Sequence, residues 1–177
     1  MVRKLKTDRR SGCPVSMSLD ILGDRWSLLI VRDLMVRGYR TFHEFLRAGE
    51  GIATNILSDR LQRLEVAGIL EREPATDGRS TYYRLTARGI ALAPVLLELL
   101  IWGANNEQSD APCTAIEDMA RNRDAVLAEA YRRWEQRDLT PLIPPFESKP
   151  KSLKIKSTTP DSPKPIQTNS PKGKVKQ

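Results

Sequence analysis

The sequence predicts a mainly α-helical fold that carries one short β-hairpin. Between residues 54 and 68 the leucines recur at helical intervals, with polar side chains between them. Two short strand-like runs follow at 69–72 and 81–85, and the Asp-Gly pair at 77–78 between them is a strong hairpin signal. An amphipathic helix followed directly by a hairpin is therefore the centre of the predicted domain.

The helix that begins near Thr54 has an apolar stripe and a polar face. At about 100° per residue, Leu57, Leu61 and Leu64 share one stripe. The opposite face carries short amide, hydroxyl, carboxylate and guanidinium groups, which suit contacts with base edges and phosphates in a DNA major groove: Thr54, Asn55, Ser58, Asp59, Gln62 and Arg63. Two interpretations of Asp59 stay open, acceptance from a cytosine amino group or pairing with Arg63 or Arg60.

The segment before this recognition helix predicts a second, shorter helix. Thr41 and Glu44 have capping-box spacing, so a helix starts near Thr41, and Gly49 and Gly51 end it in a turn. Two helices joined through a glycine-containing turn form a helix-turn-helix, and the hairpin after it makes the fold a winged helix. At the mouth of the shorter helix and on the wing, five residues are expected to hold the DNA backbone: Arg37, Arg40, Thr41, Arg79 and Ser80.

Helices are also expected on both sides of this unit. Pro14 suits a first helical position, and a second helix follows from about Trp26 to Val36, with Trp26 in the core. Thr86 is a natural cap for a helix toward Trp102, which Pro94 must kink or restart.

The segment 94–102 is apolar nearly all round. A small winged domain cannot bury every side of a peripheral helix, so a second copy of the chain is expected to cover part of it, which predicts a homodimer. The alternative is burial under the first or last helix of the same chain. One last helix is predicted over about 114–137, opening with capping-box spacing at Thr114 and Glu117, and its role stays open.

In these features the chain resembles the HxlR-type branch of the MarR-related winged-helix regulators of bacteria. Four stretches carry the resemblance in family order: Cys13-Pro14, Leu22-Gly23-Asp24-Arg25-Trp26, residues 51–70, and residues 85–103. The family usually has Gly-Gly-Lys-Trp where this chain has Gly23-Asp24-Arg25-Trp26, which is a local departure that keeps the tryptophan. The resemblance implies a DNA-binding transcription regulator.

Charge and proline divide the chain into three parts. Residues 148–177 hold eight lysines and one acid, Asp161, so they account for the whole net charge of +7. Residues 1–12 are predicted to be a flexible N-terminus, 13–138 the folded domain with its dimerisation helices, and 139–177 a disordered Lys/Pro-rich tail. The tail is either a cationic arm that grips DNA or a solvating segment.

Several function classes lack their sequence signals. Residues 1–12 lack the hydrophobic run of a signal peptide, and the apolar stretch 90–102 is too short and interrupted for a membrane span, so a cytoplasmic protein is expected. The two cysteines form no metal-ligand cluster, and His43 lies on a polar helix face, so neither a metal nor a cofactor is expected. No catalytic motif is visible, and we expect the protein not to be an enzyme.

Cys13 is a candidate redox sensor. It precedes the helix start at Pro14, where the helix dipole and the nearby Arg9 and Arg10 favour the reactive thiolate. Many proteins of the resembled family respond to oxidants or electrophiles through a cysteine at this position, which implies an oxidant or small-molecule effector. The alternative is an inert, half-buried thiol. Cys113 is a conceivable resolving partner, but the sequence does not place the two sulfurs within bonding distance.

The sequence thus predicts a sequence-specific regulator that binds pseudo-palindromic double-stranded DNA as a homodimer, with recognition helices in successive major grooves about 34 Å apart. The alternative is a winged-helix protein-interaction module that does not bind specific DNA. Such a module would expose apolar residues on the recognition helix, for which Ile56 and Val66 are the candidates.

Overall fold

The computed structural model of the chain describes residues 11–74, 81–108 and 113–143. The two strands form one antiparallel sheet, and the mainly helical fold with a single β-hairpin confirms the prediction. The elements in chain order are α1 (Pro14–Leu22), α2 (Arg25–Val36), α3 (Phe42–Leu46), α4 (Thr54–Val66), β1 (Leu70–Pro74), β2 (Thr81–Leu85), α5 (Ala87–Ile90), α6 (Ala93–Asn106), α7 (Cys113–Arg121) and α8 (Arg123–Gln136).

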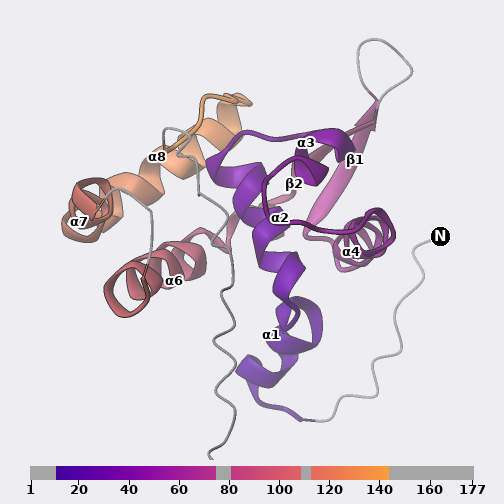
Figure 1. The fold of residues 1–177 in the computed structure, drawn as a ribbon, viewed down its shortest axis with the longest axis horizontal. Helices are drawn as coiled ribbons and strands as arrows, with labels where there is room; N and C mark the ends of the chain where they lie inside the picture. The colour runs from indigo at the N-terminus through magenta and orange to yellow at the C-terminus, as the bar shows by residue number, and fades with distance from the viewer. Residues whose placement is uncertain (1–10, 75–80, 109–112, 144–177) are drawn as a thin grey trace, which may run out of the picture.

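Helix α2 lies at the centre of the molecule (Figure 1). Helix α4 and the hairpin lie on one side of it, and α6 and α8 lie on the other. Helix α2 contacts α4, β2, α6 and α8, and it also contacts α1, which extends away from the body. Because α4 and β2 both rest on α2, the placement of α2 decides how the recognition helix and the wing sit relative to each other.

The main core lies where α2, α3, α4 and the hairpin meet. Leu57, Leu61 and Leu64 of α4 are at most 1% exposed. They cluster with Val31 of α2 and Phe45 of α3. Burial of one leucine side chain stabilises a fold by about 1.5–3 kcal/mol. The apolar stripe predicted from the sequence therefore fixes α4 with its polar face outward.

Local capping signals set the start of α3 as predicted. Thr41 is its N-cap, and the Thr41 hydroxyl accepts from the backbone N–H of Glu44 at 3.3 Å. The Glu44 carboxylate in turn accepts from the backbone N–H of Thr41 at 2.7 Å. Both halves of the capping box are therefore present.

The end of α4 directs the chain into the hairpin. Gly68 has a φ of +69°, a left-handed conformation that favours glycine. Its N–H donates to the carbonyl of Glu65, and the N–H of Ile69 donates to the carbonyl of Leu64, both at 2.9 Å. This is the Schellman arrangement, and it confirms the predicted helix stop at Gly68.

The wing is the β1–β2 hairpin, whose register pairs Leu70 with Leu85 and Pro74 with Thr81. Its predicted turn at residues 77–78 lies outside the described residues. After β2 the chain passes so close to β1 that a Cβ at Gly89 would lie 2.1 Å from the carbonyl oxygen of Ile69. Only glycine fits there without a backbone shift.

The helices after the wing restart at Pro94, as the sequence suggested. Helix α5 ends at Ile90, and α6 begins at Ala93 with Pro94 in its first turn. By length and composition the run Ala87–Asn106, with a mean hydropathy of 1.6, is the one described stretch apolar enough to cross a membrane. The turn at residues 91–92 divides it, and Leu97 and Ile101 pack against α7 within a second small core.

The single helix predicted over 114–137 is wrong, because the chain forms two helices there. Helix α7 ends at Arg121, and Asn122 leaves the helical conformation with φ −119° and ψ 41°. Thr114 lies inside α7 and is not its cap. Helices α7 and α8 both contact α6, and α8 also contacts α2 and α5. The chain direction changes at Asn122, so one straight helix does not describe this segment.

The folded domain also extends beyond the predicted boundary at 138. Ile143 is buried, and the N–H of Leu142 donates to the carbonyl of Val36 at 2.7 Å. A Cβ at Gly38 would lie 2.1 Å from the carbonyl oxygen of Leu139, so this segment is pressed against the α2–α3 connection. The remainder of the predicted tail, 144–177, and residues 1–10 lie outside the described residues.

Candidate nucleic-acid interface

The polar face of α4 is uncovered in the protomer. The residues assigned to it from the sequence are all exposed: Thr54, Asn55, Ser58, Asp59, Gln62 and Arg63. We call these six residues the polar row. They come from successive turns of one helix that is held from behind by its buried leucines. The row therefore presents hydrogen-bond donors and acceptors on a rigid support.

Asp59 is paired within the protomer. Its Oδ2 atom lies 3.0 Å from Nε of Arg63, which is four residues further along the helix. The same oxygen accepts from Arg60. Both pairings that the sequence left open are thus present, and they neutralise the only acid in the polar row.

Arg60 joins the recognition helix to the start of α2. Its Nε lies 2.9 Å from Oδ1 of Asp24, at ion-pair distance although not in hydrogen-bond geometry. Asp24 is the N-cap of α2 and accepts from the backbone N–H groups of Trp26 and Ser27. Burial raises the pKa of Asp24, but hydrogen bonds from Ser27 and Trp26 and the charge of Arg60 outweigh it, so the pKa lies below its usual value.

The three residues expected at the mouth of α3 have structural partners. Nη1 of Arg37 donates to the carbonyl of Ala48 at 2.9 Å and lies 3.3 Å from the buried Asp33. Burial raises the pKa of Asp33 above its usual value, against the opposing charges of its arginine neighbours. Thr41 caps α3, and Arg40 pairs with Glu73 of β1. Arg37, Arg40 and Thr41 therefore all stabilise the chain around the start of α3.

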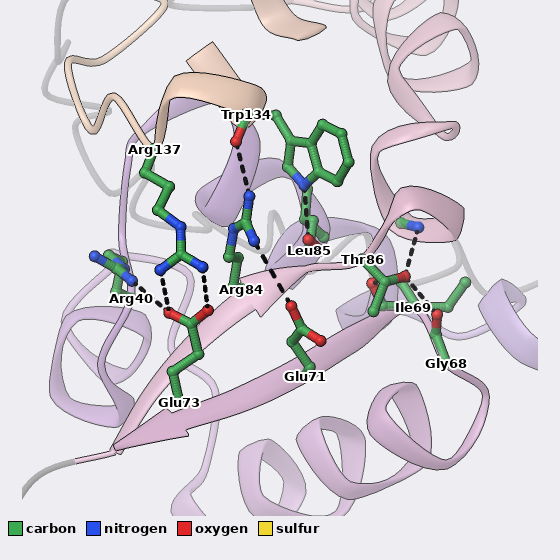
Figure 2. A network of polar contacts seen from close by, with 11 residues as sticks. Arg40, Gly68, Ile69, Glu71, Glu73, Arg84, Leu85, Thr86, Trp134 and Arg137 are labelled. Atoms are coloured by element: carbon green, nitrogen blue, oxygen red, sulfur yellow. Dashed lines mark hydrogen bonds and ion pairs between the residues drawn. The ribbon is translucent and has the colours of Figure 1, made fainter. Parts of the chain in front are cut away.

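Arg40 and the two strands of the wing belong to one polar network (Figure 2). Arg40 Nη2 lies 3.2 Å from Glu73 Oε2, and its guanidinium stands 4.8 Å from the ring centroid of Tyr82. The carbonyl of Arg40 also accepts from the N–H of Tyr83 at 2.8 Å. The network ties the mouth of α3 to both strands. Arg79 and Ser80, expected on the wing, lie outside the described residues.

The sequence did not reveal that α8 joins this network. Trp134 donates from Nε1 to the carbonyl of Leu85, and Arg137 pairs with Glu73 (Figure 2). These partners are 49 and 64 residues apart along the chain. No local spacing signals such contacts. The one hint was an apolar tryptophan in a helix rich in charge.

Cys13 is the exposed N-cap residue of α1. The backbone N–H groups of Ser16 and Val15 lower the pKa of its thiol below the usual value. This agrees with the expected effect of a helix start. The side chain of Cys113 is outside the described part of the structure, and so are Arg9 and Arg10.

Two helices leave apolar side chains in solvent. On α6, the side chains that face away from α7 are 48–57% exposed, and on α1 two more are 58–66% exposed: Val95, Leu99, Trp102, Val15 and Leu19. We call these five residues the apolar face. The sequence left open that another helix of the same chain covers the apolar segment 94–102. Helix α7 covers part of α6 in this way, but the apolar face stays exposed in the single chain.

Within the described ranges no three His, Cys, Asp or Glu side chains gather as a metal site would require. His43 is exposed and stands edge-on to Phe42.

Comparison with known families matches residues 21–111, slightly more than half of the chain, to the HxlR-like helix-turn-helix family. The uncharacterized HTH-type transcriptional regulator YybR of Bacillus subtilis is 34% identical over 98 residues, which are 55% of this chain and 78% of YybR. The HTH-type transcriptional regulator YodB of the same organism is 36% identical over 93 residues, 51% of this chain and 81% of YodB. These relatives are transcriptional regulators, not enzymes.

Solved structures agree on the fold. The crystal structure of PA1607 superposes with a TM-score of 0.54 at 39% identity, over 59% of this chain and 72% of PA1607. The redox regulator HypR in its oxidized form gives a TM-score of 0.50 at 33% identity, over 55% of this chain and 100% of HypR. The matched family region ends before α7 begins.

Proposed function

Because the chain belongs to the HxlR-like family of helix-turn-helix transcriptional regulators, we propose that it binds specific, pseudo-palindromic DNA as a homodimer. The polar row of α4, uncovered and rigidly held, is the observation that carries this proposal. Short amide and hydroxyl side chains on such a helix fit the donor and acceptor pattern of base pairs in the major groove. The fold holds the helix in place, and the polar row supplies the hydrogen-bonding groups that would contact DNA.

Within the polar row, Thr54, Asn55, Ser58 and Gln62 contact bases or phosphates in this proposal. Arg63 is the one cation of the row, and it is held by Asp59 in the protomer. When a phosphate or guanine competes for Arg63, Asp59 keeps Arg60 as its partner or accepts from a cytosine amino group.

The DNA backbone is held by residues at two neighbouring places. Arg37 uses one guanidinium nitrogen to contact Ala48 and Asp33, and Arg40 uses one to contact Glu73. Their remaining N–H groups are directed to phosphate in this proposal. Thr41 supports the same mouth of α3. Arg79 and Ser80 hold the backbone from the tip of the wing.

The homodimer forms through the apolar face. Exposed apolar side chains gathered on two helices mark interaction sites, and a second copy of the chain covers the same face on both protomers by two-fold symmetry. A two-fold axis gives paired recognition helices, which match half-sites about 34 Å apart. A protein-interaction module is less well supported, because Val66 is the one strongly exposed large apolar side chain of α4.

Cys13 is the proposed point at which an oxidant or electrophile acts. Its thiol is exposed and has a lowered pKa, and the relative HypR is a redox regulator. The helix that Cys13 caps carries part of the apolar face, so modification there alters dimer geometry. Identical DNA affinity of reduced protein, diamide-treated protein and Cys13→Ser protein would contradict this role.

The function is tested with a duplex selected from random-sequence DNA by the full-length protein. Fluorescence anisotropy should show this duplex bound at least about 10³-fold more tightly than a scrambled duplex of equal length. The affinity should fall steadily with salt, and sedimentation should give two protomers per duplex. Equal affinity for the two duplexes would contradict sequence-specific regulation and favour the interaction module.

A further inference from the structure

Helix α8 is locked to the end of strand β2 (Figure 2). Nε1 of Trp134 donates to the carbonyl of Leu85 at 2.7 Å, and Nη2 of Arg84 donates back to the carbonyl of Trp134 at 3.0 Å. The Arg84 guanidinium also lies 5.3 Å from the centroid of the Trp134 ring. Strand and helix therefore satisfy each other's polar groups at one junction.

A second contact holds strand β1 closer to the tip of the wing. Nη2 of Arg137, the C-cap residue of α8, lies 3.2 Å from Oε1 of Glu73, and Nη2 of Arg40 lies 3.2 Å from the other oxygen. The side chains of Glu73 and Arg40 are only 22% and 21% exposed, so water screens their contact less than it screens a surface pair, whereas Arg137 is 59% exposed. The strand that leads to the wing tip is thus clamped between α8 and the α2–α3 connection.

Helix α8 is itself anchored on its far side. Arg133 donates to the carbonyl of Thr140 at 2.6 Å, and the N–H of Leu142 reaches the carbonyl of Val36. The chain after α8 therefore binds back onto α2. Because α8 is held on both sides, it restrains the wing. A loosely attached helix would instead move together with the wing.

The junction between α8 and the wing is nearly filled. The cavity there, lined by Leu34, Tyr83, Trp134 and their neighbours, has a volume of about 50 Å³. That volume holds a few water molecules, whereas small-molecule sites usually measure about 300–1,000 Å³. Direct packing, not a bound ligand, thus joins α8 to the wing.

We propose that α8 is a positioning element for the wing, which fixes the angle of the hairpin and thereby the contribution of the wing to DNA affinity. Trp134 and Arg137 carry this role, and neither belongs to the polar row. The proposal rests on the proposed function, because the wing must meet DNA. Helix α8 lies beyond residues 21–111, the part of the chain matched by the family.

Amide hydrogen exchange tests the restraint without DNA. Trp134→Phe removes the indole N–H but keeps most of the ring, and loss of one hydrogen bond should speed exchange of the hairpin amides about fivefold. Amides of α4 should keep their rates. Arg121→Ala, which breaks a largely exposed ion pair on α7 outside the apolar face, is the control. Unchanged hairpin exchange in Trp134→Phe protein would overturn the proposal.

A double-mutant cycle tests the effect on DNA affinity. Arg79→Ala should weaken binding of the selected duplex several-fold in the wild-type background, but much less in the Trp134→Phe background, because a displaced wing no longer delivers its arginine. Arg137→Ala should act like Trp134→Phe, whereas Arg121→Ala, which breaks a largely exposed pair on α7, should not. Additive losses in the cycle would overturn the positioning role.

The two proposals fail in different ways. If the wild-type protein prefers no duplex, the proposed function fails, and the positioning of a DNA-contacting wing fails with it. If the wild-type protein binds its selected duplex and the losses are additive, only the positioning role of α8 is refuted. The hydrogen-exchange result separates a restrained wing from an unrestrained one in either case.

Discussion

Asp24→Ala should destabilise the domain by about 1.5–3 kcal/mol, because one carboxylate serves two elements. It accepts from the N–H of Trp26 at 2.8 Å and of Ser27 at 3.0 Å, and it lies 2.9 Å from Nε of Arg60. Loss of an N-cap costs about 0.5–2 kcal/mol. Leaving the Arg60 side chain, which is only 18% exposed, without this partner adds about 1 kcal/mol.

Thermal unfolding at a fixed protomer concentration measures this effect, since dimerisation makes Tm depend on concentration. The expected loss corresponds to a fall in Tm of about 4–12 °C for a domain of this size. Asp24→Asn keeps an acceptor for the cap but removes the charge, so it should cost about 1 kcal/mol. Asp124→Ala, an exposed acid in the first turn of α8, is the matched control.

The pH dependence has a definite sign. Hydrogen bonds and Arg60 hold the pKa of Asp24 below its ordinary value of 3.8 despite the opposing effect of burial. A carboxyl with a lowered pKa in the folded state contributes stability above the ordinary pKa and loses it as the pH falls through the folded value. The difference between wild-type and Asp24→Asn protein should therefore be constant near neutrality and shrink below about pH 4. A loss under 0.5 kcal/mol for Asp24→Ala, or equal losses for both variants, would refute this reasoning.

Three further outcomes are expected. In anisotropy titrations Asn55→Ala should change which base is preferred, whereas Arg79→Ala should weaken all duplexes alike; uniform loss from both would contradict the assigned roles. Leu99→Asp, which places a charge on the apolar face, should convert dimers to monomers in sedimentation, and an unchanged mass would exclude that face as the interface. In Cys113→Ser protein, alkylation of Cys13 should persist below the usual thiol pH range because its pKa is lowered, and a profile like that of free cysteine would argue against an activated thiol.

The parts of the fold that the sequence predicted correctly are those with local causes. The capping box at Thr41, the stop at Gly68 and the leucine stripe of α4 each depend on residues within about two helical turns. The exposure of the polar row followed from the same periodicity. Its DNA contacts stay predictions, because no DNA is present to test them.

The parts that the sequence missed depend on distant partners. The break at Asn122 lacks a proline or glycine, and the contacts on either side of it are with helices that precede it in the chain: α6 for α7, and α2, α5 and α6 for α8. Arg84 of β2 binds the carbonyl of Trp134, which is 50 residues away along the chain. Charge patterns do not identify which of many arginines meets which acid once the chain has folded.

The backbone hydrogen bond between Leu142 and Val36 shows where the chain can be shortened to remove the lysine-rich segment without disturbing the folded domain. Cutting after residue 138 would strip the α2–α3 connection of the chain that lies against Gly38 and would expose the surface beneath Ile143. Any loss of DNA affinity would then mix two causes, missing positive charge and a disturbed helix-turn-helix. Shortened proteins that stop after Ile143 keep these contacts, so they report on the lysines alone.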